Sequence, residues 1–139
     1  MPQMPSLPAP PPNTPLLDDA AIVERIAALL GDFPATGRTL WTFFLDAERV
    51  QLPLLLPLDD LPTRPVPTLA RSLLDVLART LANDDAGGGV VLTLERPGPV
   101  RISDADREWC RLLSAAAGTF DVMVHGIYLA VSGRVSRLS

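Results

Sequence analysis

Apolar positions along the chain recur with two different periods, and each period predicts a different kind of element. Spacings of three and four residues are typical of helices, and we predict helices over Leu17–Leu30, Thr68–Ala82 and Ser103–Gly118. The side chains expected to face the core are Ile22, Ile26, Leu29 and Leu30 in the first helix, Leu69, Leu73, Val76, Leu77 and Leu81 in the second, and Trp109, Leu112, Leu113 and Ala116 in the third.

Five shorter apolar segments rich in branched and aromatic residues predict strands. The segment Leu40–Leu45 is apolar on both faces, which indicates a central strand covered on both sides. Pro53 cannot donate a ladder hydrogen bond, so its strand is expected at an edge or at a bulge. The predicted strands are Leu40–Leu45, Val50–Leu56, Val90–Leu94, Asp121–Val131 and Arg134–Leu138, the last two joined by a Ser132–Gly133 turn.

Local polar residues predict where the helices begin and end. Asp18 and Asp19 fall in the expected first turn of the first helix, and Gly31 supplies its stop. Thr68 is the expected N-cap of the second helix. Ser103 opens the third helix with Asp106 three residues on, a variant of the capping box; Gly118 is expected to end it.

The order of elements is helix, strand hairpin, helix, strand, helix, strand hairpin. It predicts one α/β layered domain, with a mixed sheet of about five to six strands and about three helices on its faces. Residues 1–15 hold seven of the chain's 15 prolines and predict a disordered or polyproline II tail, so the domain is expected over residues 16–139. The tail is interpreted as a tether, with a ligand for an aromatic groove as the alternative.

Composition narrows the classes of function. All 12 basic residues are arginine, which indicates a bacterial genome of high GC content; a need for bidentate arginine contacts is the alternative. The net charge of −4 argues against a nucleic-acid partner. Mean hydropathy is +0.24, yet no apolar run reaches the roughly 20 residues of a membrane span, and the N-terminus does not resemble a signal peptide. A cytoplasmic location without a membrane partner is expected.

Few residues are suited to catalysis. His125 is the only histidine and lies within a predicted strand, where a structural role is expected. Cys110 is the only cysteine, which excludes an internal disulfide and a cysteine zinc cage, and it is interpreted as a small buried apolar residue. No serine-hydrolase, dithiol, zinc-protease or dinucleotide motif occurs, so no cofactor is expected.

The loop Arg96–Arg101 is the strongest candidate for a binding site, because it follows the carboxyl end of a strand, where α/β sheets bind ligands. Arg96, Arg101 and Arg107 are the candidate binding residues for an anion or a partner near the N-terminus of the third helix. Local pairing is the favoured interpretation of these arginines, because Asp104 and Asp106 lie in the first turn of the same helix.

From Leu40 onward the chain resembles the JAB/MPN metalloprotease superfamily, especially its RadC-like branch. The opening hairpin from Thr39 to Ala47, the loop from Arg96 to Gly98 and the segment from Ser103 to Asp106 are similar to its motifs, as is the closing segment His125–Arg134. The resemblance implies that family's topology, which is cytidine-deaminase-like, and a zinc site of two histidines and one aspartate with an upstream glutamate as base.

The zinc ligands that the resemblance implies are not complete. Leu94 and Arg96 stand at the two histidine positions, and no glutamate occurs between Glu48 and Glu95. Only Ser103 and Asp106 of the motif are retained, and Asp106→Asn is expected to cost about 1 kcal/mol or less, as the loss of a cap partner.

The resemblance therefore predicts a metal-free relative, a non-catalytic binding or scaffolding domain. Its expected partner is a protein, a peptide or a second copy of the chain, approached through a sheet edge or the Arg96–Arg101 loop. The alternative is an enzyme of another type, acting on an anionic small molecule at the Arg96–Asp106 loop.

Overall fold

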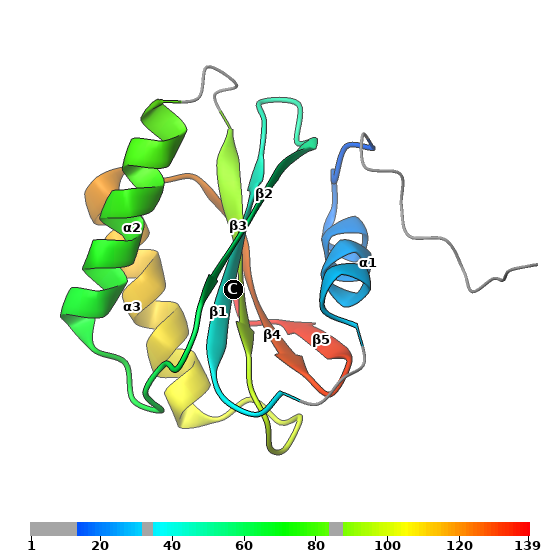
Figure 1. Ribbon diagram of the computed structural model, residues 1–139, viewed down its shortest axis with the longest axis vertical. Helices are drawn as coiled ribbons and strands as arrows, with labels where there is room; N and C mark the ends of the chain where they lie inside the picture. The colour runs from blue at the N-terminus through cyan, green and yellow to red at the C-terminus, as the bar shows by residue number, and fades with distance from the viewer. Residues whose placement is uncertain (1–13, 32–34, 84–87) are drawn as a thin grey trace, which may run out of the picture.

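The described residues form a five-stranded mixed sheet with helices on both of its faces (Figure 1). The structure is a computed structural model that describes residues 14–31, 35–83 and 88–139. The sheet order is β2-β1-β3-β4-β5, in which only β3 and β4 run parallel. The elements are α1 (Asp19–Leu30), β1 (Thr39–Leu45), β2 (Gln51–Leu58), α2 (Pro67–Ala82), β3 (Gly89–Glu95), α3 (Asp104–Phe120), β4 (Val124–Val131) and β5 (Arg134–Arg137).

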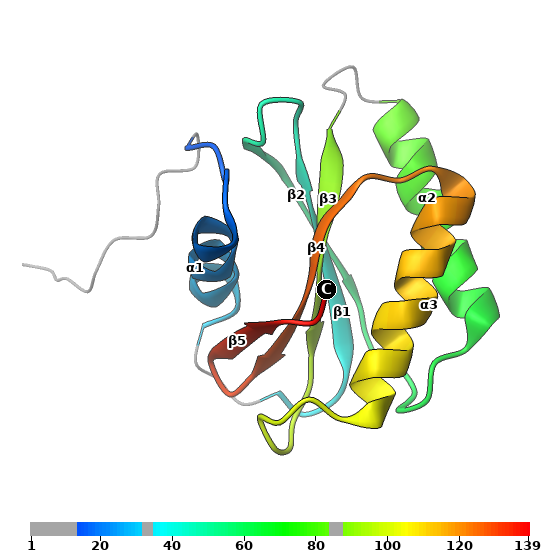
Figure 2. The same cartoon turned by 180° about the vertical axis from the view of Figure 1, so that it is seen from behind.

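The sheet separates two unequal hydrophobic layers. Helices α2 and α3 cover one face, and α1 lies on the opposite face (Figures 1 and 2). The larger core joins alternate residues of β1, β3 and β4 to the inner sides of α2 and α3, with Trp109 among its fully buried side chains. The smaller core places Leu16, Ile22 and Ile26 against Phe43 and Tyr128. The predicted order of elements and the prediction of an α/β domain with a mixed sheet are therefore confirmed.

The strand predictions agree with the sheet. β1 is a central strand, between β2 and β3. β2, the strand of Pro53, is an edge strand, and its register with β1 shifts between Phe43 and Leu45. Both outcomes expected of Pro53 are therefore met. The turn between β4 and β5 has positive φ at Ser132 (50°) and Gly133 (82°), as a two-residue hairpin turn requires.

Helix α1 begins two residues later than predicted. Asp18 is the N-cap, and its carboxylate accepts a hydrogen bond from the backbone N–H of Ala21 at 2.8 Å, which leaves Leu17 outside the helix and exposed. Gly31 ends the helix at φ 69°, as predicted. Leu29, expected in the core, is 39% exposed, because α1 packs mainly through Ile22 and Ile26 and covers only part of the sheet face.

Helix α2 differs from its prediction at its start and at one core position. Leu77 is fully buried as predicted, and the predicted core residues Leu69, Leu73 and Leu81 are partly buried against the larger core. The N-cap is Val66 and not Thr68, because Pro67 occupies the first helical position, where its missing N–H costs nothing. The fully buried positions are Ala70, Leu74 and Leu77. Val76, predicted to face the core, is 50% exposed.

Helix α3 begins as predicted and ends two residues later. Ser103 is the N-cap and forms the capping box with Asp106. Gly118 does not end the helix, which continues to Phe120, a side chain that packs on the larger core. Asp121 ends it in the left-handed conformation at φ 55°. The expected core residues Trp109, Leu113 and Ala116 are buried, whereas Leu112 is only partly so.

The predicted N-terminal tail falls mostly outside the described residues, because residues 1–13 belong there. The described chain begins at Thr14, and Leu16 is already fully buried, with its backbone N–H donating to the carbonyl of Arg49 at 2.9 Å. In the described segments, the helices are too short or too polar to span a bilayer.

Candidate functional site

The loop between β3 and α3 is organised around the side chain of Arg96, which is 3% exposed. Its Nε and Nη2 atoms donate to the two carboxylate oxygens of Asp106 at 2.9 and 2.7 Å. Its Nη1 and Nη2 atoms also donate to the carbonyls of Pro97, Pro99 and Arg101, at 3.0, 2.8 and 2.9 Å. A guanidinium group has five N–H donors. All five are used within the protein, and none is left for a ligand.

The loop backbone folds back around this guanidinium group. Gly98 adopts φ 99°, a backbone conformation that residues other than glycine rarely adopt. A Cβ atom placed there would lie 3.5 Å from Nη1 of Arg96. The backbone N–H of Arg96 donates to the carbonyl of Ala130 in β4 at 3.2 Å, which attaches the start of the loop to the sheet. The Arg96 side chain thus acts as the internal support of the loop.

Asp106 is the most buried charged residue of the site, with no measurable exposure. Besides its two bonds from Arg96, its Oδ2 atom accepts from the backbone N–H of Ser103 at 2.9 Å, and its own N–H donates to Oγ of Ser103 at 3.1 Å. Burial by itself raises the pKa of Asp106, but the hydrogen bonds from Arg96 and Ser103 outweigh it and lower that pKa below the ordinary carboxyl value. The carboxylate is therefore ionised at neutral pH.

Arg38 is a member of the site that the sequence analysis missed. Its Nη1 atom lies 3.6 Å from Oδ1 of Asp106 and is buried without a hydrogen-bond partner among the described residues. The pairing of the strands explains why these residues lie together, and a prediction of that pairing is the signal that could have found Arg38. The antiparallel register of β1 and β3 places Thr39 opposite Glu95, so Arg38 and Arg96 are the next residues at the same end of the sheet.

An open hollow of about 580 Å³ lies beside this ion pair. We call it the arginine hollow, because four of the nine residues that line it are arginines. The nine lining residues are Arg38, Arg96, Pro97, Pro99, Arg101, Ile102, Ser103, Asp104 and Arg107.

The structure brings Arg96, Arg101 and Arg107 together, as predicted, but gives them different roles. Arg96 cannot gather an anion, because its donors are all used; for this residue the structure confirms the local pairing that the sequence favours. The Nη1 atom of Arg107 lies 4.0 Å from Oδ1 of Asp104, an exposed pair of the kind that contributes little. Arg101 is exposed, and the described residues give its side chain no hydrogen bond or ion pair.

The positions at which the resemblance implies zinc ligands do not fit a metal ion. Leu94 is an apolar side chain in the larger core, 1% exposed. Both carboxylate oxygens of Asp106 face the cationic guanidinium group of Arg96, which repels a divalent cation and cannot be deprotonated. Across residues 14–31, 35–83 and 88–139, no three histidine, cysteine, aspartate or glutamate residues are placed to hold a metal ion.

His125 belongs to the opposite end of the sheet. A Cβ atom on Gly89, the first residue of β3, would lie 2.9 Å from Nε2 of His125, whereas Arg96 follows the last residue of β3. Seven strand residues span roughly 20 Å, so the imidazole does not reach the arginine hollow. Burial, followed by the charge of Arg49, lowers the pKa of His125, so this side chain is neutral at pH 7.

Cys110 lies on α3 and is 8% exposed. Burial raises the pKa of its thiol, although hydrogen bonds with Ser114 and Ser139 oppose that rise. A thiol with a raised pKa is a poor nucleophile at neutral pH. Its position agrees with the interpretation of Cys110 as a small buried residue.

No protein-family model matches the chain, and no curated protein sequence matches it significantly.

Proposed function

We propose that the chain is a non-catalytic binding or scaffolding domain, and that a protein or peptide partner docks over the arginine hollow. The observation that carries this proposal is the complete internal use of Arg96 and Asp106. The two groups with the most specific placement in the loop hold the loop in shape. The loop and the start of α3 then present a fixed surface outward, lined by Arg101 from the loop and Arg107 from the helix.

The chemistry of the hollow supports binding better than catalysis. A general acid or base needs a pKa near the working pH. The pKa of Asp106 is instead lowered by its hydrogen bonds, and both of its oxygens are already bonded. The imidazole of His125 lies at the other end of β3.

The proposal includes a distant relationship to the JAB/MPN superfamily, as a metal-free member related to the RadC-like branch. The position of Arg96 supports it. Where the resemblance implies a zinc ion beside the aspartate, the guanidinium group of Arg96 supplies a positive charge to both oxygens of Asp106. A cytoplasmic location is part of the same proposal, and the buried free thiol of Cys110 is compatible with it.

The loop is a better docking surface than the β2 edge of the sheet. β2 contains Pro53 and Pro57, which have no backbone N–H and protect an edge strand from pairing with another chain. A second copy of the chain is one form that the partner can take, because the hollow is open to a protein surface.

The second candidate function is an enzyme of another type, acting on an anionic small molecule at the Arg96–Asp106 loop. The observation that favours it is the size of the arginine hollow, about 580 Å³, which falls within the range of small-molecule sites. Such sites are mostly apolar, whereas this hollow is lined by four arginines and an aspartate.

The test is a comparison of binding partners for three forms of the full chain. Arg101→Glu/Arg107→Glu reverses the charge of the exposed arginines at the hollow, and Arg71→Glu makes the same change on the exposed side of α2. We expect the wild type and Arg71→Glu to retain a protein partner that binds directly in purified form, and the double variant to lose it. A partner retained equally by all three forms would contradict the proposed surface.

A further inference from the structure

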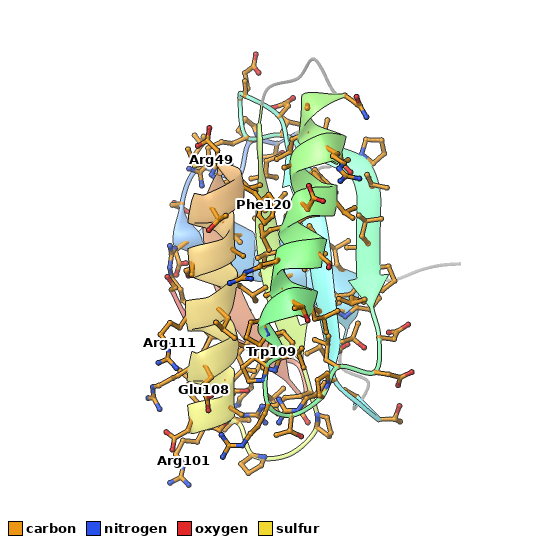
Figure 3. All side chains as sticks on the ribbon, turned by 90° about the vertical axis from the view of Figure 1, so that its left-hand side faces the viewer. Arg49, Arg101, Glu108, Trp109, Arg111 and Phe120 are labelled. Atoms are coloured by element: carbon orange, nitrogen blue, oxygen red, sulfur yellow. The ribbon has the colours of Figure 1, made fainter. Side chains whose placement is uncertain are left out.

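A second open hollow, of about 460 Å³, adjoins the arginine hollow along α3. The two hollows share Ile102 and Arg107, and the second adds Arg111 and the polar side chains of Ser114 and Ser139. Three exposed arginines, Arg101, Arg107 and Arg111, therefore line two neighbouring hollows; we call them the arginine strip. Figure 3 shows Arg101 near the N-terminal end of α3 and Arg111 further along the helix.

The spacing of the strip matches an extended chain. Arg107 and Arg111 are four residues apart on one helix, a rise of about 6 Å along its axis. In an extended peptide, side chains at alternate positions point to the same side and lie about 7 Å apart. Carboxylates at alternate positions of such a peptide can therefore meet both guanidinium groups, in the bidentate geometry that arginine favours.

We propose that the arginine strip binds an extended acidic segment of the partner, with carboxylates at alternate positions. This inference rests on the proposed function and names the chemistry of the partner's contact. One carboxylate enters the arginine hollow, where Arg38 and Arg101 face it, and the next ones follow α3 past Arg107 and Arg111.

The charges around the strip favour such a ligand. Arg38 adds a further positive charge to the lining of the arginine hollow, and its Nη1 atom, 3.6 Å from Asp106, has no hydrogen-bond partner among the described residues. The first two N–H groups of α3, those of Asp104 and Ala105, have no acceptor within the helix. Two acidic side chains compete: Asp104, which pairs with Arg107, and Glu108, which pairs with Arg64 at 3.3 Å. Both pairs are at the surface, where they contribute little.

The test uses the full chain and synthetic peptides. One peptide has glutamate at alternate positions, and its control has glutamine at the same positions. Binding is followed by fluorescence anisotropy at low ionic strength for the wild type, Arg107→Ala/Arg111→Ala, the single variant Arg111→Ala and the control Arg71→Ala. A separate arm titrates inorganic phosphate, with chloride at matched ionic strength, against the melting temperature.

We expect the wild type and Arg71→Ala to bind the glutamate peptide alike, and the double variant to bind it at least tenfold more weakly. The glutamine peptide should not bind. Three results would contradict binding of an acidic segment by the arginine strip: equal binding of the two peptides, an equal loss of binding in Arg71→Ala, or no binding of the glutamate peptide.

The phosphate arm distinguishes a segment from a small anion. If Arg111→Ala weakens binding of the glutamate peptide but leaves a saturable effect of phosphate on the melting temperature unchanged, the arginine strip binds an extended ligand. If phosphate binds and the peptide does not, the ligand is a small anion and the inference fails. A partner that is lost in Arg101→Glu/Arg107→Glu while the peptide fails to bind would leave the proposed function standing and remove only the strip.

Discussion

A buried arginine stabilises a fold only when each of its donors has a partner, and Arg96 meets this condition through one carboxylate and three carbonyls. Removing one member of such a pair leaves the other charged and buried. The sequence alone indicates a cap role for Asp106 with a cost of about 1 kcal/mol. The structure changes that expectation, because the same carboxylate also neutralises Arg96.

Asp106→Asn is therefore expected to lower the free energy of unfolding by about 3–5 kcal/mol, the cost of breaking a buried ion pair. Urea melts of purified protein measure it. The control is Asp104→Asn in the same helical turn, where the side chain is exposed and a change within about 0.5 kcal/mol is expected. A loss of only about 1 kcal/mol for Asp106→Asn would restore the simple cap role.

The same carboxylate makes stability depend on pH. The hydrogen bonds from Arg96 and Ser103 outweigh burial and lower the pKa of Asp106 in the folded state, so the unfolded chain binds this proton more tightly. The stabilisation is complete above the ordinary carboxyl pKa of about 3.9 and is lost as the pH falls through the lower folded pKa. As the pH falls from about 4 to about 3, we expect the urea midpoint of the wild type to fall more steeply than that of Asp106→Asn. Parallel slopes would contradict this assignment.

At the scale of elements, the two long helices begin in different ways, and this difference is testable. α3 begins with a capping box, whereas α2 begins with Pro67 and has no side-chain cap. Ser103→Ala should cost about 1 kcal/mol, because the N–H of Asp106 loses its acceptor. Thr68→Ala should change stability by less than about 0.5 kcal/mol. Thermal or urea melts of both variants measure the difference, and equal costs would restore the cap predicted for Thr68.

The elements themselves were predictable where periodicity and local chemistry agree. Ser103 with Asp106, the Ser132–Gly133 turn and the proline-bearing β2 edge each have a local cause that is visible in the sequence. Errors came where tertiary packing decides. Val76 carries the helical period of α2 but lies on its outer side, and Gly118 continues α3 because Phe120 still packs on the core.

The sequence predicted only those contacts of the site that join residues close together along the chain. The loop arginines and the aspartates that pair with them are neighbours in sequence, so local pairing could be predicted from the sequence. Arg38 lies 58 residues before Arg96, and only the pairing of β1 with β3 brings the two to the same end of the sheet. The complete bonding of Arg96 to carbonyls depends on the path of the loop backbone, which no residue pattern specifies.

At the scale of the whole molecule, the domain boundary has a measurable consequence. The domain is expected to begin at residue 16, and Leu16 is fully buried in the smaller core. Removing residues 1–15 should leave the melting temperature nearly unchanged, because the prolines of that segment are expected to bury little apolar surface. Leu16→Ala in the full chain should cost about 2–5 kcal/mol. A fall of many degrees after the truncation would move the boundary towards the N-terminus.

The protein's relation to metal ions is the last prediction, and it tests the proposed ancestry and the site together. Zinc binding needs several neutral or anionic ligands that converge on one point. Here Leu94 is apolar, Arg96 is permanently cationic, and Asp106 offers both oxygens to that cation. We expect purified full-length protein to contain no stoichiometric zinc by elemental analysis, and neither excess zinc nor EDTA to shift its melting temperature. As a matched variant, Asp106→Asn should lose stability to the same extent with and without EDTA, because it removes the partner of Arg96 and not a ligand. Close to one equivalent of zinc per chain, released together with stability by EDTA, would overturn the assignment of Arg96 as the resident cation of the site.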